Sequence, residues 1–327
     1  MKIPLFFDGY DLKAYDLPFG QNLSQLRERA RYLYRSAKGV QPRTGFYTAF
    51  ANLVRSIEST GHEVHVNNFR LARNDPARPI GMSGFMPPFA RFGLTNPVIY
   101  GPGRVPDPND LDELRQTLNL KIVTYPSEWP IELNAPDRRD LFATMFVGID
   151  TDAWPDISSE PKTCDVLLYN KVRWHQAERE RDLLRPIRSM LKRRGLGWKE
   201  LRYGAHNLET FRKTVTGARS MIFVAEHETQ GLAYQEAMSS NLPVFAWDDG
   251  ELVDPSQRKL AGAHLRVSSV PYFDQRCGLT FTRDNIEERF EDFWKRRADF
   301  RPRDYVLEHL SLERGAQRFL DLYATML

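Results

Sequence analysis

Two glutamates, Glu228 and Glu236, lie eight positions apart in the stretch "MIFVAEHETQGLAYQEAMSSNLPVFAW". The apolar run before them predicts a strand, and the residues after Gly231 predict a helix that leads to a second apolar run. Glu228 would then lie in the turn, and Glu236 about 7.5 Å further along the helix axis. Because doubly wound sheets bind ligands beyond the carboxyl ends of their strands, these carboxylates could grip two parts of one ligand.

The turn between that strand and helix adds a second kind of chemistry. Gly231 allows a close approach of the backbone, and free amides at a helix start favour a diphosphate or sugar oxygens. Taken alone, two glutamates are more often ordinary solvent-facing residues. The residues around them decide between these interpretations.

The segment resembles the signature of the retaining GT-B glycosyltransferases of family four, which reads E-x-x-G-L-x-x-x-E-A-M-A-x-G-x-P-V. The matching residues are Glu228, Gly231, Leu232, Glu236, Ala237, Met238, Pro243 and Val244. Asn241 stands where the family has Gly, and Asn tolerates the left-handed conformation in which helices end. The stretches "RTGFYTAFANLVRSIESTGHEVHV", "VGIDTDAWPD" and "SLERGAQRFLDLY" resemble further segments of this family.

The resemblance implies roles for individual residues. Glu236 would bind the ribose of the nucleotide, and Glu228 would contact the donor sugar. The positions that would face the sugar or the diphosphate are Thr229, Gln230, Gly231 and Leu232, together with Gly45 in the first domain. Tyr203 and Gly204 are candidates for lining the base.

The family also places an Arg and a Lys after the first strand of its second domain, where they neutralise the leaving diphosphate. Here "LLYNKVRWHQAER" offers Lys171, Arg173 and Arg179, without the usual G-R-x5-K spacing. Fixed positive charge suits the charge that develops on a phosphate in a closed site. We expect Lys171 and Arg173 to neutralise the leaving diphosphate, without a metal ion or any other cofactor. No D-x-D demands a metal, and the "DD" of "AWDDG" is interpreted as a turn.

The elements that must position these residues alternate along the chain. In the second half, strands are predicted at 164–170, 198–204, 220–225 and 242–247, with helices at 179–195, 207–218 and 231–240. In the first half, strands are predicted at 3–7, 62–66, 96–101 and 120–129, with helices at about 23–35, from Gly45 to just before Gly61, and across "DPNDLDELRQTL". Residues 71–97, rich in Gly, Pro and Met, are predicted to be irregular surface. Strands that alternate with helices predict parallel sheets.

We therefore expect an α/β protein with two doubly wound, Rossmann-like domains facing across a cleft, as the GT-B resemblance implies. Residues 1–155 would form the acceptor-side domain and residues 163–310 the nucleotide-sugar domain. Residues 311–327 would form a terminal helix that packs back toward the first domain, and "PDISSEPKT" a linker. The segment between residues 8 and 44, with "YGPGRVPDP" and "YPSEWP", offers candidates for the acceptor site without naming an acceptor.

The composition and charge of the chain limit the classes of partner that we expect. The 327 residues are 41% hydrophobic and carry a formal charge of +3, which fits a soluble globular protein without the basic stripe of a nucleic-acid binder. Two cysteines, Cys164 and Cys277, are too few for a disulfide framework. This fits a reducing compartment, and we expect the cytoplasm. No apolar window is long enough to cross a bilayer, so any membrane contact would be peripheral.

These features predict a glycosyltransferase that moves a sugar from a nucleotide-sugar donor with retention of configuration. The acceptor could be a saccharide, a lipid-linked molecule or another small molecule. Two alternatives stay open: a nucleotide-sugar-binding protein without turnover, which the unusual "YNKVRW" favours, and a GT-B-fold epimerase or phosphorylase. A nicotinamide dehydrogenase is disfavoured because no G-x-G-x-x-G follows a predicted strand.

Overall fold

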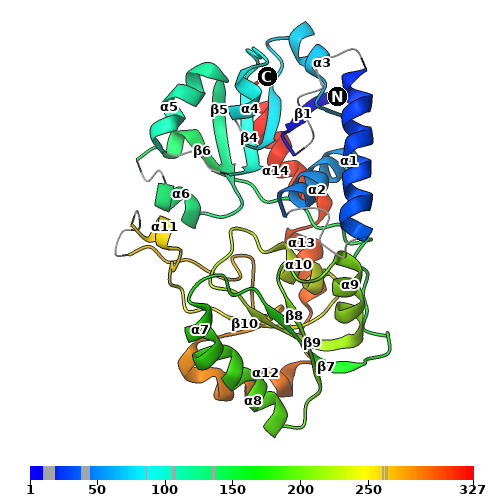
Figure 1. The fold of residues 1–327 in the computed structure, drawn as a ribbon, viewed down its shortest axis with the longest axis vertical. Coiled ribbons are helices and arrows are strands. Elements are labelled where there is room, and N and C mark those ends of the chain that lie inside the picture. The colour runs from blue at the N-terminus through cyan, green and yellow to red at the C-terminus, as the bar shows by residue number, and fades with distance from the viewer. Residues whose placement is uncertain are drawn as a thin grey trace. The chain divides into compact units, whose positions relative to one another are not determined.

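The computed structural model describes residues 1–9, 19–37, 45–85, 87–104, 108–134, 137–259, 261 and 264–327. The chain forms two compact units, each with its own parallel sheet (Figure 1). Unit 1 comprises Met1–Gly148 and Leu310–Leu327, and unit 2 comprises Ile149–His309. The segment 155–163, predicted to be a linker, belongs to unit 2. Ile157 is buried there, and its N–H donates to the carbonyl of Ser240 (3.2 Å).

In the described part of unit 1, six strands run parallel in the order β2-β1-β3-β4-β5-β6. The strands are β1 (Lys2–Phe7), β2 (Glu63–Val66), β3 (Ile80–Gly84), β4 (Val98–Gly103), β5 (Leu120–Tyr125) and β6 (Phe142–Thr144). The helices are α1 (Gly20–Ala37), α2 (Gly45–Ser59), α3 (Phe69–Asn74), α4 (Pro87–Ala90), α5 (Pro108–Thr117), α6 (Trp129–Asn134) and α14 (Leu312–Ala324).

Helix α2 forms where the spacing of apolar residues predicts it. Phe50, Leu53 and Ile57 recur at three- and four-residue intervals and are almost fully buried. Phe46, four residues before Phe50, has the same spacing but is 42% exposed. The helix ends two residues before Gly61, whose positive φ of 79° is the conformation in which glycine terminates helices.

Strand β3 lies within residues 71–97, where irregular surface was predicted, so that prediction is wrong. All five of its residues are buried, and it pairs with both β1 and β4. Its glycine content reflects close packing. A Cβ on Gly81 would lie 2.6 Å from Leu5 and 3.3 Å from the Phe319 ring of α14. Glycine is common in loops, but in β3 it allows neighbouring side chains to pack close to the backbone of a central strand.

In the described part of unit 2, five strands run parallel in the order β11-β10-β9-β7-β8. The strands are β7 (Cys164–Asn170), β8 (Trp198–Arg202), β9 (Ala218–Val224), β10 (Val244–Trp247) and β11 (Gly278–Phe281). The helices are α7 (Gln176–Arg179), α8 (Arg185–Arg193), α9 (Leu208–Gly217), α10 (Leu232–Ser239), α11 (Pro255–Arg258), α12 (Ile286–Arg296) and α13 (Pro302–His309). A π-helical turn, Glu180–Leu184, joins α7 to α8.

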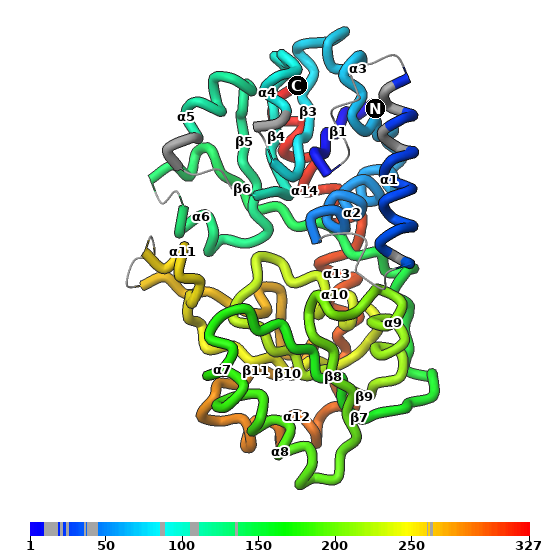
Figure 2. Tube along the Cα trace, viewed as in Figure 1, coloured from blue at the N-terminus to red at the C-terminus, as the bar shows by residue number. Residues whose placement is uncertain are grey.

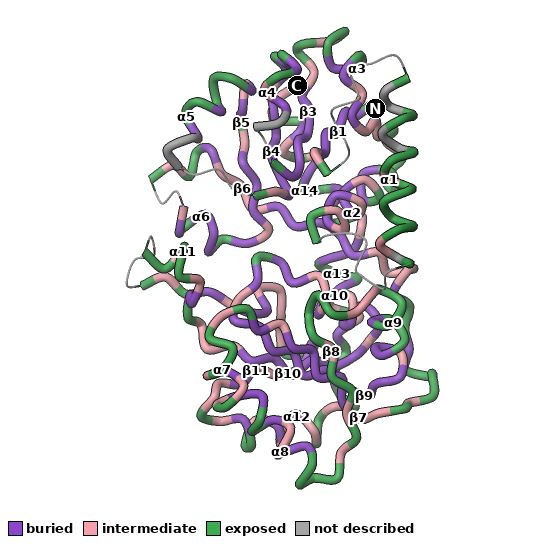
Figure 3. The backbone as a smooth tube through the Cα atoms, in the orientation of Figure 1, coloured by how far each residue is buried: buried purple, intermediate pink, exposed green. Residues whose placement is uncertain are grey.

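Both sheets begin with an internal strand. The second strand of each unit pairs on one side of the first, and the third strand pairs on the other side. Figure 3 shows that burial follows the strands within each unit. Strands β6 and β11 were not predicted from the sequence. Asn241 follows α10 with a φ of 60°, the left-handed conformation expected where the family motif has glycine.

Helix α14 returns to unit 1 from the far end of the chain and packs on α2 (Figure 2). The chain segments meet at two glycines, where side chains would separate them. A Cβ on Gly315 would lie 2.4 Å from the backbone nitrogen of Gly148, and a Cβ on Gly148 would lie 2.6 Å from the Cα of Leu312. Backbone atoms cannot move aside as a flexible side chain can, so this contact requires glycine at both positions.

Gly315→Ala should therefore lower the free energy of unfolding by about 1–3 kcal/mol, the usual cost of overpacking a buried contact. Thermal melts would measure the loss. Gly197→Ala is the matched control, because a Cβ there meets only the Asp165 carboxylate at an ordinary 3.7 Å. Equal melting temperatures for the two variants would contradict this view of the α14 contact.

Candidate functional site

The candidate site of unit 2 lies where the chain leaves two neighbouring strands in different directions. Strands β7 and β9 pair in parallel, with Asn170 opposite Val224 at their carboxyl ends. The chain after β7 leads toward β8 on one side, and the chain after β9 leads toward β10 on the other. Doubly wound domains bind ligands beyond the carboxyl ends of strands that diverge in this way. Most of the predicted site residues lie on the loops after these strands.

An ion pair joins the two loops. The Lys171 ammonium group contacts the Glu228 carboxylate, and their side chains are only 11% and 9% exposed. The backbone orients both partners: the Lys171 N–H donates to the carbonyl of Val224 (2.8 Å), and the Glu228 N–H donates to that of Ser268 (2.9 Å). Removing one charge of such a pair would leave the other uncompensated in a poorly solvated place.

A second carboxylate, that of Glu226, accepts hydrogen bonds from backbone N–H groups of the loop after β7. Glu226 is 4% exposed. It accepts the N–H of Arg173 through both oxygens (3.1 and 3.2 Å) and the N–H of Trp174 through Oε1 (3.1 Å). Glu226, which precedes the family motif by two residues, was not predicted as a site residue. Its only sequence signal is the alternation of acidic residues in "AEHE".

Aromatic rings surround the cations. The Lys171 ammonium lies 4.8 Å, and the Arg173 guanidinium 5.5 Å, from the centre of the Tyr203 ring. Both distances are within the range of cation–π attraction. Trp174 stacks on His227 with ring centres 5.0 Å apart. Burial lowers the pKa of His227 to about 4, so this histidine is neutral near neutral pH.

Helix α10 begins beside these loops. Gly231 precedes it with a φ of 84°, and a Cβ there would lie 2.1 Å from the Tyr234 ring. The side chain of Gln230 turns into the fold and donates to Gln235 (3.0 Å). Thr229 is exposed, and Leu232 is half-buried. The backbone amides at this helix start, rather than the Gln230 side chain, are therefore the groups suited to a ligand.

Glu236 follows on α10 and is half-buried. Burial raises the pKa of its carboxyl to about 8, against the opposing effects of the Arg212 charge and a hydrogen bond from Trp154. Trp154 itself is 5% exposed, and the Arg212 guanidinium lies over the Trp154 ring, 4.9 Å from the ring centre. Trp154 and Arg212 are further neighbours of the site that the motif did not reveal.

The buried phenol of Tyr169, on β7, shows which predicted residues gather. Its pKa is raised, first by burial and then by the charges of Glu228, Glu236 and Tyr203, while Arg173 opposes the shift. Four of the predicted residues therefore lie within electrostatic range of one side chain, and Lys171 joins them through Glu228. Gly204 follows Tyr203 with a φ of 79°.

Other candidates lie elsewhere. Gly45 belongs to unit 1, where it begins α2. Arg179 is 4% exposed, and its guanidinium covers the Trp247 ring at 5.1 Å, so it is a packing residue rather than an open cation. The two residues of "DD", interpreted as a turn, lie in the irregular segment after β10, and both have structural partners. Asp248 accepts the N–H of Ser269 (3.0 Å), and Asp249 pairs with Arg283 (2.7 Å).

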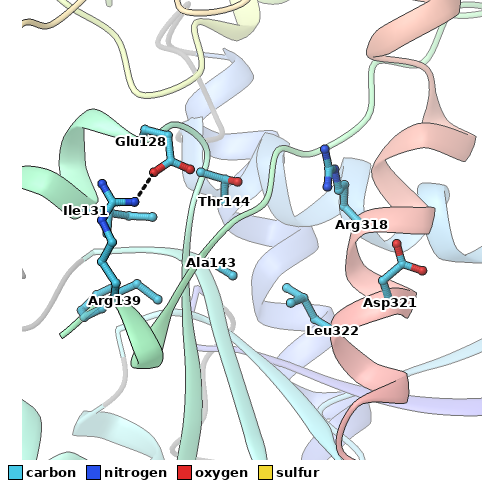
Figure 4. A pocket seen from close by; sticks show the side chains of 9 residues that line it. Glu128, Ile131, Arg139, Ala143, Thr144, Arg318, Asp321 and Leu322 are labelled. Atoms are coloured by element: carbon cyan, nitrogen blue, oxygen red, sulfur yellow. Dashed lines mark hydrogen bonds and ion pairs between the residues drawn. The ribbon is translucent and has the colours of Figure 1, made fainter.

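Unit 1 holds a separate cavity of about 310 Å³. It is lined by Glu128, Ile131, Arg139, Phe142, Ala143, Thr144, Arg318, Asp321 and Leu322. Figure 4 shows the pair of Arg139 with Glu128 (2.8 Å) on one side, and Arg318 and Asp321 of α14 on the other. Its charged residues are exposed and balance in sign, unlike the buried carboxylates of unit 2.

Parts of the predicted acceptor candidates, residues 10–18, 38–44 and 105–107, lie outside the described residues. Among the residues described, no group of three or more His, Cys, Asp or Glu side chains is placed to hold a metal ion. None of the helices in the same part of the chain is long and apolar enough to cross a bilayer.

No protein-family model matches this chain, and a search of curated proteins found no match. Solved structures match it along its whole length. AviGT4, a glycosyltransferase involved in avilamycin A biosynthesis, aligns with a TM-score of 0.55 at 12% identity, over 100% of this chain and 98% of its own. A glycosyltransferase from Rickettsia africae aligns with a TM-score of 0.55 at 10% identity, over 99% and 98% of the two chains.

Sucrose-phosphate synthase from Thermosynechococcus elongatus aligns with a TM-score of 0.53 at 12% identity, over 100% of this chain and 99% of its own. At such identities the likeness concerns the fold. The predicted fold class is confirmed: this is a mixed α/β protein with two parallel sheets, and it matches GT-B glycosyltransferase structures.

The raised pKa of Glu236 makes stability depend on pH. The folded protein keeps this proton up to about pH 8, whereas the unfolded chain releases it near the ordinary value of 4.5. Stability should therefore fall as pH rises through this window. Glu236→Gln, which cannot ionise, should melt like wild type at about pH 5 and several degrees higher at about pH 8. A gap that does not change with pH would contradict the burial of this carboxyl.

Proposed function

We propose that this protein is a glycosyltransferase that takes its sugar from a nucleotide-sugar donor bound to unit 2. The observation that carries the proposal is the buried Lys171–Glu228 pair at the point where β7 and β9 diverge. It places a cation and a carboxylate on the loops that lead to the backbone amides of a helix start, that of α10. These groups suit a diphosphate and the hydroxyls of a sugar.

The proposed roles follow from charge and position. A donor diphosphate competes with Glu228 for Lys171, because phosphate oxygens also make strong charge-assisted hydrogen bonds. Arg173, on the same loop, adds a second positive charge. Glu228 is then available to the sugar, and Glu236 and the base-side Tyr203 to the nucleoside. In this view the leaving diphosphate is stabilised by fixed charges already in place.

We further propose retention of configuration and turnover without a metal ion, since both cations needed by the leaving group come from the chain. A chelator should leave the rate unchanged. Activity that disappears with chelator and returns with magnesium or manganese would contradict this part. The acceptor chemistry follows from neither the cations nor the carboxylates of unit 2.

A thermal-shift screen against nucleoside diphosphates and their sugar conjugates tests the proposal. A ligand that binds only the folded state raises the melting temperature. We expect one base to give a clear rise, with and without the sugar. Release of free diphosphate from the sugar conjugate then separates a transferase from a protein that binds without turnover. No shift with any base would overturn the proposal.

Above about pH 8, where the Glu236 carboxyl is ionised, Glu236→Ala should weaken binding of the bare nucleoside diphosphate by about 1.5 to 3 kcal/mol, the range for hydrogen bonds to charged groups. Titration calorimetry measures this directly. Glu209→Ala is a control, because Glu209 lies exposed in the first turn of α9. Equal affinities for wild type and Glu236→Ala would contradict a contact between Glu236 and the nucleotide.

Glu228→Gln should separate binding from rate. The amide keeps the shape of the side chain but not its charge, and the nucleotide is held by other groups. We expect nucleoside diphosphate affinity to be no weaker than that of wild type, because the amide competes less for Lys171, while turnover falls by about 10² or more, the scale of losing one positioned transition-state interaction. Wild-type turnover in this variant would remove Glu228 from the reacting centre.

A further inference from the structure

Glu226 fills a place where a doubly wound domain can bind an anion. The amides of Arg173 and Trp174 follow one another after β7 and point at a single carboxylate. Successive backbone N–H groups of this kind form anion-binding concavities. Here the anion is part of the chain, held by three contacts of 3.1 to 3.2 Å and shielded from water.

This arrangement has a consequence for any phosphate ligand. Because the Glu226 carboxylate already occupies the amides of Arg173 and Trp174, a diphosphate cannot use them. On this loop, the groups left to meet its charge are the side chains of Lys171 and Arg173. The position of those side chains then depends on how firmly the loop backbone is held.

Three groups of contacts fix the start of this loop against the end of β9 and the loop that follows it. The Lys171 N–H binds Val224, the Lys171 ammonium binds Glu228, and the amides of Arg173 and Trp174 bind Glu226. When a ligand draws Lys171 away from Glu228, the side-chain contact is lost. The Glu226 contacts do not involve the ammonium, so they remain to hold the backbone.

We infer that Glu226 is a positioning residue for the leaving group: it holds the loop from Lys171 to Trp174 so that Lys171 and Arg173 meet the donor diphosphate. This inference rests on the proposed function and deepens it. Without Glu226, two amides in a poorly solvated place lose their acceptor, and the loop rearranges to satisfy them. The cations would still be present but no longer in place.

A double-mutant cycle on diphosphate binding tests this. The probes are UDP, GDP, ADP and dTDP, each titrated into the full chain. The variants are Glu226→Ala, Lys171→Met and the double variant. Each single change should weaken the bound probe on the order of tenfold or more, as for a lost charge-assisted hydrogen bond. The double variant should bind about as weakly as the weaker single variant, because groups that act through one another are not additive.

Two further variants separate positioning from general stability. Asp165→Ala removes another carboxylate that accepts a backbone N–H, that of Gly197 (2.8 Å), but near the amino end of β7. It should leave diphosphate affinity unchanged. Glu226→Gln should bind nearly as wild type does, because Oε1 alone accepts from both Arg173 and Trp174. Melting temperatures identify variants that do not fold, and Glu226→Asp then replaces Glu226→Ala in the cycle.

The outcomes are distinct. If none of the four probes binds wild type, the proposed function fails and this inference fails with it. If a probe binds wild type but the losses from Glu226 and Lys171 add, Glu226 acts independently of the cation and only this inference is overturned. Wild-type affinity in Glu226→Ala, or an equal loss in Asp165→Ala, would overturn it in the same way.

Discussion

The candidate site depends on one constraint, the divergence of the chain beyond two paired strands. Where β7 and β9 end, their loops part, and the polar groups between them are shielded from water without a regular ladder of hydrogen bonds. Buried polar groups must find partners. Glu226 and Glu228 supply them, one to backbone amides and the other to the Lys171 ammonium. Two carboxylates in three residues thereby fix a loop that carries two cations.

Unit 1 shows the same strand arrangement with different chemistry. Asp8 follows β1 there, and burial raises the pKa of its carboxyl. The space that a side chain at Gly84 would need is taken by this carboxylate. In unit 2, by contrast, the Glu228 carboxylate has the Lys171 ammonium as its partner. The proposed diphosphate chemistry rests on that pair.

The sequence predicted the architecture well because alternation of apolar runs is a local property. Strands β7 and β9 and helix α10 lie where their patterns placed them. Strand β3 was missed because the reason for a glycine at position 81 is its packing against Phe319, almost 240 positions away in the chain. Arg179 was a candidate cation because nothing in the sequence shows that its side chain lies on Trp247.

The candidate site was predicted in part for the same reason. The motif identified Glu228 and Glu236, but the partners of Glu226 are backbone amides about 50 positions earlier, which carry no residue-type signal. The contact between Lys171 and Glu228 depends on β7 lying beside β9, a strand order that the pattern of elements does not determine. The residues of the motif could be predicted from the sequence, whereas the contacts between the loops after β7 and β9 could be identified only from the fold.

Hydrogen–deuterium exchange with and without a bound nucleoside diphosphate would show whether the nucleotide binds at the loops after β7 and β9. We expect slower exchange in the segments 168–175 and 226–236, with little change around Thr144 and Arg318 in unit 1. Protection confined to the unit 1 cavity, or no protection in either segment of unit 2 while the ligand is bound, would contradict it.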